Sequence, residues 1–254
     1  MTIEQFNVLY QIQKQGKNFK TENVIVKTEY MAEKIHEIID GLLKCGWIND
    51  AGITEQGQKE LNRYKVDNAI IMAAGFGLRS LPLSRYVPKG LFKVKGEVLV
   101  ERQIEQLKEA GVEEIIVVVG YLKEKFLYLR EKYGAIIVEN NDYYRYNNMS
   151  SLYAAKDYLK NSFVCCSDNY FTENVFENYV YDSYYSCKYT EQYADEHCVM
   201  RTDGDYIAEI IKGGEKAWYT IGEAYFSKEF SSKFCEYMEQ EYHTKDAKKF
   251  IWRI

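Results

Sequence analysis

The stretch that decides the fold of this chain is Ala69-Ile-Ile-Met-Ala-Ala74 with its continuation Gly75-Phe-Gly-Leu-Arg79-Ser-Leu-Pro82-Leu-Ser-Arg85-Tyr-Val-Pro88-Lys89. The apolar run predicts a β-strand, and the glycines and prolines after it predict a loop. Glycine lets backbone N–H groups approach a phosphate closely. Arg79 and Lys89 add positive charge, and both prolines of the chain lie here and stiffen the loop. The pattern therefore predicts a loop that holds a nucleoside triphosphate.

From about residue 66 onward, apolar strands alternate with amphipathic helices, which predicts a parallel sheet with right-handed crossovers. The predicted strands are Ala69–Ala74, Glu114–Val119, Ala135–Glu139 and Phe163–Ser167, and the helices are Leu99–Ala110, Lys123–Tyr133 and Ser150–Leu159. After Asp168 the pattern predicts antiparallel strands at Tyr184–Tyr189, Cys198–Arg201 and Tyr206–Ile211, a turn at 202–205 and a closing helix at Ser227–Glu241. The fold class is therefore α/β, Rossmann-like, with a mixed, mostly parallel sheet.

Residues 1–65 form a separate small α+β domain in this interpretation, and residues 66–254 form the large one. Thr2 and Gln5 fit a capping box at the start of a first helix, and a second helical pattern runs from Met31 to Leu43. Two short strands around Asn49–Gly52 and a last helix from Thr54 complete a winged-helix-like unit. Residues 1–64 carry eight Lys and Arg against nine Asp and Glu. A DNA-binding module needs a basic face, so we expect a structural or protein-contact role.

Bulk composition excludes several classes of protein. The 254 residues carry a formal net charge of −5, which argues against general affinity for nucleic acid. No run approaches the roughly 18 apolar residues of a membrane span, and no signal peptide is expected at the N-terminus. Six cysteines without Cys-x-x-Cys spacing indicate reduced thiols in a cytoplasm.

Ligands of open α/β sheets bind beyond the carboxyl ends of the strands, and three polar segments are predicted there. They are the loop 75–89, the carboxamide-rich segment 140–151 and Ser167-Asp168-Asn169. The sequence thus places a phosphate loop, a carboxamide cluster and one carboxylate on one rim of the sheet.

These residues resemble a known family. Ala-Ala-Gly-Phe-Gly-x-Arg-x-x-Pro, with Pro88-Lys89 after five residues, resembles the opening motif of the nucleotidyltransferases that activate sugar phosphates and phosphocholine. Further matches are similar to bacterial CTP:phosphocholine cytidylyltransferases: Glu101-Arg-Gln-Ile-Glu-x-Leu, Val119-Gly-Tyr-Leu-Lys, Tyr146-Asn-Asn-x-x-Ser-Leu and Ser167-Asp-Asn-Tyr170. The resemblance covers about residues 66–230. It implies transfer of CMP from CTP to phosphocholine, giving CDP-choline and pyrophosphate.

The resemblance also implies roles for individual residues. Ala73, Ala74, Gly75, Phe76 and Gly77 would enclose base, ribose and triphosphate. Arg79 would hold the β- and γ-phosphates, and Lys89 would meet the α-phosphate and the incoming phosphate. Asp168 would hold Mg²⁺. The cytosine edge would be read by Asn147 or Asn148, with Gln103 as a weaker candidate.

Each of these positions also has a structural interpretation that the sequence leaves open. Gly75 and Gly77 fit an ordinary strand–helix turn, and Lys89 fits a solvated surface lysine. Asp168 fits a helix cap near Thr172, and the Asn147-Asn148 pair fits a turn.

A choline acceptor would expose a quaternary ammonium to aromatic faces. The candidate acceptor-binding residues are Tyr185, Tyr189, Tyr193, His197, Trp218, Tyr219 and Tyr225. His197 stands where the phosphocholine relatives lead us to expect an aromatic residue such as Trp. A primary-amine acceptor, an aminoalkyl phosphate or phosphonate, therefore stays open. The oligomeric state is also open, a homodimer included.

The relatives supply a second metal-binding carboxylate from a Trp-Glu-Asp-like segment, whereas Phe250-Ile-Trp252 is followed here by Arg253 and Ile254. Arg cannot bind Mg²⁺, so either the sequence is cut short before that carboxylate, or Glu223 or Asp246 substitutes for it, or the activity is impaired. Without a substitute we expect weak or absent activity with CTP binding retained. The choline kinase domain of some relatives does not follow in this sequence.

Two other functions compete with this interpretation. A sugar-phosphate uridylyl- or guanylyltransferase would use the same chemistry but would need hydroxyl-binding residues in place of the aromatic-rich region after residue 181. A nucleotide-sensing regulator would use the winged-helix-like unit on DNA and the large domain only for ligand binding.

Overall fold

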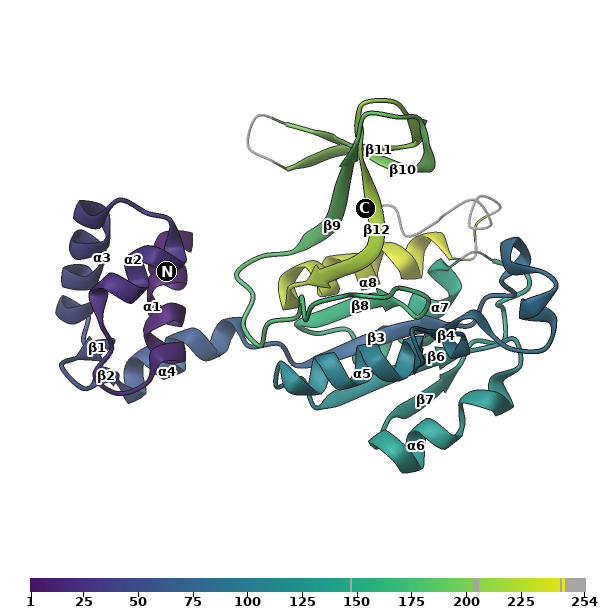
Figure 1. The fold of residues 1–254 in the computed structure, drawn as a ribbon, viewed down its shortest axis with the longest axis horizontal. Coiled ribbons are helices and arrows are strands. Elements are labelled where there is room, and N and C mark those ends of the chain that lie inside the picture. Colours follow the sequence, from purple (N-terminus) through teal and green to yellow (C-terminus); the bar gives the residue numbers. More distant parts are fainter. Residues whose placement is uncertain (147, 203–205, 243, 245–254) are drawn as a thin grey trace. The chain divides into compact units, whose positions relative to one another are not determined.

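The computed structural model describes residues 1–146, 148–202, 206–242 and 244 (Figure 1). Contacts divide the chain into two compact units. Unit 1 comprises Met1–Lys65 together with Tyr179–Tyr181, and unit 2 comprises the rest of the chain from Val66. The sequence analysis did not anticipate that Tyr179–Tyr181 belong to unit 1. In the described residues, no helix is both long enough and apolar enough to cross a bilayer.

Unit 1 consists of helices and one short hairpin. Its elements are α1 (Ile3–Gln15), α2 (Thr21–Thr28), α3 (Ala32–Lys44), β1 (Ile48–Asn49), β2 (Gly52–Ile53) and α4 (Glu55–Leu61). The predicted capping box is confirmed, since the Thr2 hydroxyl accepts from Gln5 N at 3.2 Å and Gln5 Oε1 accepts from Thr2 N at 3.0 Å. The order of elements is that expected of a winged helix, and that identification stays a prediction.

Helix α2 was missed by the sequence analysis. Its eight residues include five β-branched side chains, which lower helix propensity, and Val24 is its one buried residue. The helix is stabilised instead by tertiary packing, because Val24 joins a buried cluster with Leu9 and Ile35.

Unit 2 is built on one sheet whose strand order is β11-β10-β12-β8-β3-β6-β7, with β9 paired to β12 (Figure 1). The main strands are β3 (Asn68–Ala73), β6 (Glu114–Val119), β7 (Ile136–Glu139), β8 (Ser162–Cys166), β9 (Tyr184–Thr190), β10 (Ala194–Arg201), β11 (Ile207–Gly214) and β12 (Ala217–Phe226). The β8-β3-β6-β7 pairs are parallel, and the pairs made by β9 to β12 are antiparallel. The predicted mixed α/β fold is therefore confirmed.

Helices and a small hairpin complete unit 2. They are the hairpin β4 (Lys93–Val94) with β5 (Glu97–Val98), and the helices α5 (Leu99–Glu109), α6 (Tyr128–Tyr133), α7 (Met149–Ala154) and α8 (Lys228–Glu241). Two predicted helices are shorter than expected. In the helix predicted at Lys123–Tyr133, the first turn is a 3-10 helix at Lys123–Phe126. In the helix predicted at Ser150–Leu159, the last turn is a 3-10 helix at Lys156–Tyr158. Ser227 caps α8 by accepting from Phe230 N.

Strand β12 was also missed, although it is the longest strand described and joins the two halves of the sheet. Its sequence is interrupted by Gly222, whose φ of +79° suits glycine. The register with β9 shifts between Thr220 and Ala224, so the strand is irregular where the periodicity breaks. The predicted turn at 202–205 falls largely on residues outside the described ones.

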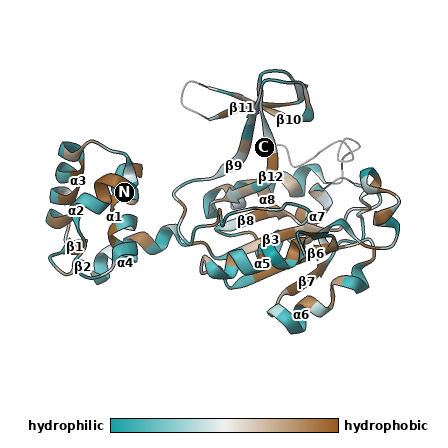
Figure 2. Ribbon diagram, viewed as in Figure 1, coloured by the Kyte–Doolittle hydropathy of each residue, from teal (hydrophilic) through white to brown (hydrophobic). Residues whose placement is uncertain are grey.

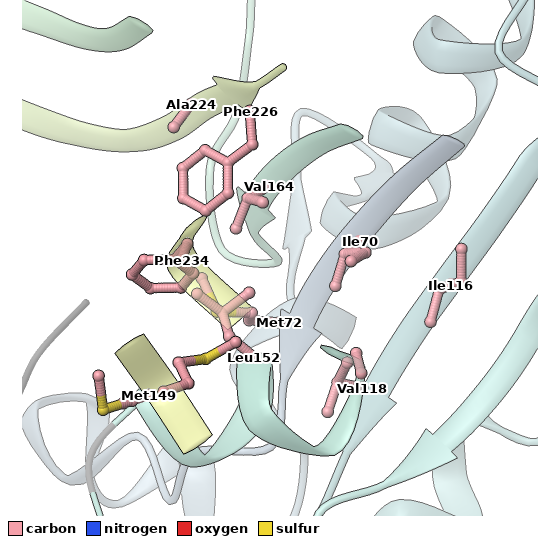
Figure 3. Packing of buried hydrophobic residues seen from close by; sticks show 12 residues of the cluster. Ile70, Met72, Ile116, Val118, Met149, Leu152, Val164, Ala224, Phe226 and Phe234 are labelled. Carbon is pink, nitrogen blue, oxygen red and sulfur yellow. The ribbon is translucent and has the colours of Figure 1, made fainter. Parts of the chain in front are cut away.

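One part of the core of unit 2 lies between the sheet and the helices α7 and α8. Figure 2 shows the central strands mostly in the colour of hydrophobic residues. Figure 3 shows side chains of the sheet facing those of α7 and α8, and the buried cluster contains Ile70, Met72, Ile116, Val118, Met149, Leu152, Val164, Ala224, Phe226 and Phe234. This packing fixes β3, β6 and β8, and so it fixes the loops at their carboxyl ends.

Candidate active site

A cavity of about 540 Å³ lies beyond the carboxyl ends of β3, β7 and β8. It brings together most of the residues that the sequence assigned to the nucleotide and the metal: Ala73, Ala74, Gly75, Phe76, Gly77, Arg79, Lys89, Asn148 and Asp168. Asn147 lies outside the described residues. Segments far apart in the sequence therefore share one cleft, at the position that open α/β sheets use for ligands.

The loop after β3 is folded tightly on itself. Gly77 has a φ of +66°, and a Cβ there would stand 2.9 Å from Lys89 Cγ. The Ser84 hydroxyl donates to Gly77 O at 2.8 Å. The stem of Lys89 thus passes over a position that only glycine fits, and this contact directs the ammonium group into the cavity.

Lys89 and Asp168 form an ion pair at the wall of the cleft. Lys89 Nζ lies 3.2 Å from Asp168 Oδ2, with the side chains 25% and 39% exposed respectively. Asp168 is not a helix cap, because residues 169–183 contain no helix. Both charges stay accessible to a phosphate ligand.

Arg79 lies at the outer end of the loop. Its Nη1 is 3.2 Å from Glu196 Oε1, and its side chain is 79% exposed. An exposed ion pair of this kind contributes only about 0–1 kcal/mol, so a polyanion can displace it.

Gln103 does not line the cavity, contrary to the suggested contact with cytosine. It is fully buried, and its Nε2 donates to Cys166 O and Asn169 O, both at 2.9 Å. These two carbonyls bracket Asp168 in the chain. Gln103 is therefore placed to hold the turn that presents the Asp168 carboxylate.

The sequence analysis placed the segment 140–151 on the rim of the sheet but gave Asn140 no role in the site. Buried Asn140 donates through Nδ2 to Ser150 Oγ at 2.8 Å and to Ser151 Oγ at 3.2 Å, which ties β7 to the start of α7. The signal for it was a carboxamide directly after a predicted strand.

An aromatic cluster around Phe76 also went unrecognised, and of its rings Phe76 and Tyr143 line the cavity. The rings of Tyr121 and Tyr143 lie 5.2 and 5.1 Å from that of Phe76. A Cβ on Gly120 would meet the Tyr143 ring at 2.8 Å, so this glycine lets the ring pack against the strand end.

The cleft offers no activated thiol. Burial, and to a smaller extent the nearby Asp168 carboxylate, raise the pKa of the Cys166 thiol to about 12, although Lys89 opposes the shift. A thiol that stays protonated at neutral pH is a poor nucleophile. The chemistry that the site supports is therefore positioning and charge neutralisation.

A second cavity, of about 720 Å³, adjoins the first and shares Arg79, Asn148, Cys166 and Asp168 with it. Its other walls come from the antiparallel strands and include Tyr185, Glu196, His197, Lys212 and Tyr219. Tyr185, His197 and Tyr219, three of the acceptor candidates, are thus brought next to the nucleotide cavity.

The other acceptor candidates lie elsewhere. Trp218 and Tyr225 line a separate cavity, whose residues extend to α8. The Tyr189 ring packs against Trp218 at 5.5 Å, and Tyr193 is 69% exposed. None of these four residues lines the cavity next to Asp168.

Glu223, considered as a second metal ligand, is only 2% exposed and lines neither cavity of the cleft. Burial raises the pKa of its carboxyl, although the hydroxyls of Tyr184 and Ser186 donate to it. Asp246 and the segment from Phe250 to Ile254 lie outside the described residues, so the predicted loss of activity stays a prediction.

The residues present fit a magnesium ion held jointly with a ligand. Among the described residues, no group of three or more His, Cys, Asp or Glu could hold a metal by itself. Asp168 stands where the two cavities meet. One carboxylate completed by substrate phosphates and water is an arrangement that Mg²⁺ accepts.

Comparison with known proteins gives a consistent result. Residues 69–206 match the MobA-like NTP transferase domain. The choline-phosphate cytidylyltransferase of Streptococcus pneumoniae is 38% identical over 184 residues, which cover 72% of this chain and 80% of that protein. The 2-aminoethylphosphonate cytidylyltransferase of Lancefieldella rimae is 38% identical over 189 residues, covering 73% and 77%. The structure of CTP:phosphocholine cytidylyltransferase from Streptococcus pneumoniae superimposes with a TM-score of 0.66 at 39% identity over 69% of this chain and 77% of that one.

Proposed function

Since the chain belongs to the MobA-like NTP transferase family and is a cytidylyltransferase, we propose that it transfers CMP from CTP to a small phosphorylated amine and releases pyrophosphate. The observation that carries this proposal is the meeting of Arg79, Lys89 and Asp168 around two adjoining cavities. One cavity is lined by the glycine loop and the other by aromatic and charged side chains.

The reaction is an in-line displacement at phosphorus. An oxygen of the acceptor's phosphoryl group forms a bond to the α-phosphorus of CTP, and the bond from that phosphorus to the bridging oxygen of pyrophosphate breaks. The electron pair of the broken bond leaves with pyrophosphate. Such a transfer needs alignment and charge neutralisation more than a protein nucleophile.

The residues of the cleft divide this work. Lys89 stabilises negative charge on the α-phosphate as the new bond forms, because it lines the cavity with its ammonium beside Asp168. Arg79 holds the β- and γ-phosphates and so stabilises the leaving pyrophosphate. Asp168 would hold Mg²⁺, which bridges and neutralises phosphate oxygens when bound.

For the acceptor we propose phosphocholine, with 2-aminoethylphosphonate as the second candidate. Tyr185 and Tyr219 support phosphocholine, because aromatic faces attract a quaternary ammonium. His197 and Glu196 in the same cavity support a primary amine, because both offer polar contacts. Relatives of each specificity are equally similar to this chain.

The test combines binding and product formation. We expect CTP with Mg²⁺ to raise the melting temperature more than UTP, GTP or ATP, since ligands of the native state stabilise it. We also expect CDP-choline from phosphocholine, or CMP joined to the phosphonate oxygen of 2-aminoethylphosphonate, detected by mass spectrometry. Equal stabilisation by all four nucleotides, or a product formed from a sugar 1-phosphate alone, would exclude the proposal.

A further inference from the structure

Strand β10 is irregular where it borders the second cavity. Its register with β11 shifts between Ala194 and His197. In a regular strand, successive side chains point to opposite faces. Here Asp195, Glu196 and His197 all line the same cavity. The irregularity therefore presents consecutive polar side chains to the cleft, as bulges beside active sites do.

The carboxylates of this cavity have different partners. Asp168 pairs with Lys89 at 3.2 Å, and Asp195 pairs with Lys212 at 3.1 Å. Glu196 pairs with Arg79, which also lines the nucleotide cavity. Glu196 is thus paired with a group that the triphosphate requires.

The N–H groups with which Arg79 pairs with Glu196 cannot bind the triphosphate at the same time. The Arg79 side chain is exposed and that of Glu196 is about half-exposed. Competition from such an ion pair can weaken the binding of a nucleotide to Arg79 by at most about fivefold. A triphosphate offers several anionic oxygens and a bidentate contact, so it wins this competition. Nucleotide binding therefore leaves Glu196 without its cation at the wall of the acceptor cavity.

We propose that Glu196 is a specificity-determining residue that pairs with the positively charged nitrogen of the acceptor once the triphosphate has drawn Arg79 away. This inference rests on the proposed function. Phosphocholine and 2-aminoethylphosphonate share the cationic nitrogen, and Tyr185 and Tyr219 flank the same cavity. The carboxylate is thus neutralised by Arg79 before CTP binds and by the acceptor afterwards.

The experiment measures binding by calorimetry with Mg²⁺ and α,β-methylene-CTP, an analogue that cannot release pyrophosphate. The acceptors are phosphocholine, 2-aminoethylphosphonate and 3,3-dimethylbutyl phosphate, which has the shape of phosphocholine without its charge. Glu196→Gln is compared with the wild type. Glu209→Gln is the matched control, because Glu209 is exposed on the neighbouring β11 and lines none of the described cavities.

With the analogue bound, we expect Glu196→Gln to raise the dissociation constant of 2-aminoethylphosphonate about 10- to 150-fold, the range of a charge-assisted hydrogen bond. The nitrogen of phosphocholine has no N–H to donate, so its dissociation constant should rise only about two- to fivefold, the range of an exposed ion pair. The same substitution should change the dissociation constant of 3,3-dimethylbutyl phosphate by no more than about twofold. Binding of the analogue itself should be unchanged or tightened up to about fivefold, because Arg79 loses a competitor. Glu209→Gln should behave as the wild type.

An unchanged dissociation constant for both cationic acceptors in Glu196→Gln would overturn the inference, as would weaker binding of the nucleotide analogue. Equal loss for the charged and uncharged acceptors would also overturn it. Failure of the wild type to bind the analogue is a different result, since it removes the proposed function itself.

Discussion

The two halves of the sheet in unit 2 differ in burial and regularity. In the parallel half, β3, β6 and β8 are buried almost throughout, the edge strand β7 is mostly half-buried, and the registers run without a break. The antiparallel strands β9 to β11 are mostly half-buried or exposed, and the pairings β10–β11 and β9–β12 contain register shifts. The nucleotide cavity stands on the rigid half and the acceptor cavity on the irregular one. We infer that the shared chemistry depends on the first half and acceptor choice on the second.

Lys89→Ala tests the parallel half at the proposed reacting centre, and it has the largest expected effect on activity. Removing a charge that stabilises the transferring phosphate should lower kcat/KM for CTP about 10²- to 10³-fold. The melting temperature should hardly change, because the Lys89–Asp168 pair is partly exposed.

Lys123→Ala is the matched control for Lys89→Ala. It removes an exposed ion pair with Glu139, 2.6 Å long, that lies outside the cavity. Comparable losses of kcat/KM in the two variants would refute the role of Lys89.

Gln103→Leu tests how the rigid half presents Asp168. Losing two buried hydrogen bonds should cost about 1–3 kcal/mol in the free energy of unfolding. The Mg²⁺ concentration for half-maximal stabilisation by α,β-methylene-CTP should rise about tenfold, the lower end of the usual effect of a residue that orients a metal ligand.

Gln106→Leu provides the comparison. Gln106 is buried on the same helix and donates to Phe171 O at 3.2 Å, outside the turn 166–169. It should destabilise similarly without altering the Mg²⁺ dependence. An equal rise in both variants would assign Gln103 a purely structural role.

Tyr219→Ala and Trp218→Ala compare the two sides of β12. Tyr219 lines the acceptor cavity and Trp218 the separate one, as neighbours on a strand do. Tyr219→Ala should raise KM for phosphocholine about two- to fivefold, the size of an exposed cation–π contact. Trp218→Ala should leave this KM unchanged, and the reverse order in steady-state kinetics would move the acceptor site to the other cavity.

Glu223→Gln probes the junction of the two halves with a small effect on stability. The raised pKa of the buried carboxyl means that its contribution to stability is full below its ordinary value of 4.5 and is lost as pH rises through the folded-state pKa. Relative to Glu223→Gln, the wild type should therefore lose unfolding free energy as pH rises above the ordinary carboxyl value of 4.5 in urea titrations. A difference independent of pH would show that the carboxyl titrates normally.

Local patterns predicted much of the fold. Glu114–Val119 is the predicted strand to the residue, and Leu99, Ile104 and Leu107 are buried on α5 as their spacing required. Helix α2 and strand β12 escaped because β-branched residues in the one and Gly222 in the other oppose the local pattern. Packing against the rest of the unit overrides propensity in both elements.

The candidate site followed the same division. Glycine, Arg79 and Lys89 on one loop were recognisable, because the residues proposed to contact a phosphate lie close together in the sequence. The burial of Gln103 beneath Asp168 was not, because its amide reaches carbonyls 63 and 66 residues away. Nor did the sequence show that adjacent Trp218 and Tyr219 face different cavities, since β12 itself had not been predicted.

The sequence alone predicted a strand, a glycine-rich loop after it and a carboxylate after a later strand, because short-range spacing encodes each of these features. The resemblance to a known family placed them in one nucleotidyltransferase domain. Only the tertiary structure decided that β12 joins the two halves of the sheet and that Arg79 meets Glu196 across 117 residues. Strand order and bulges depend on the packing of distant segments, and that packing is a property of the whole core rather than of any local stretch.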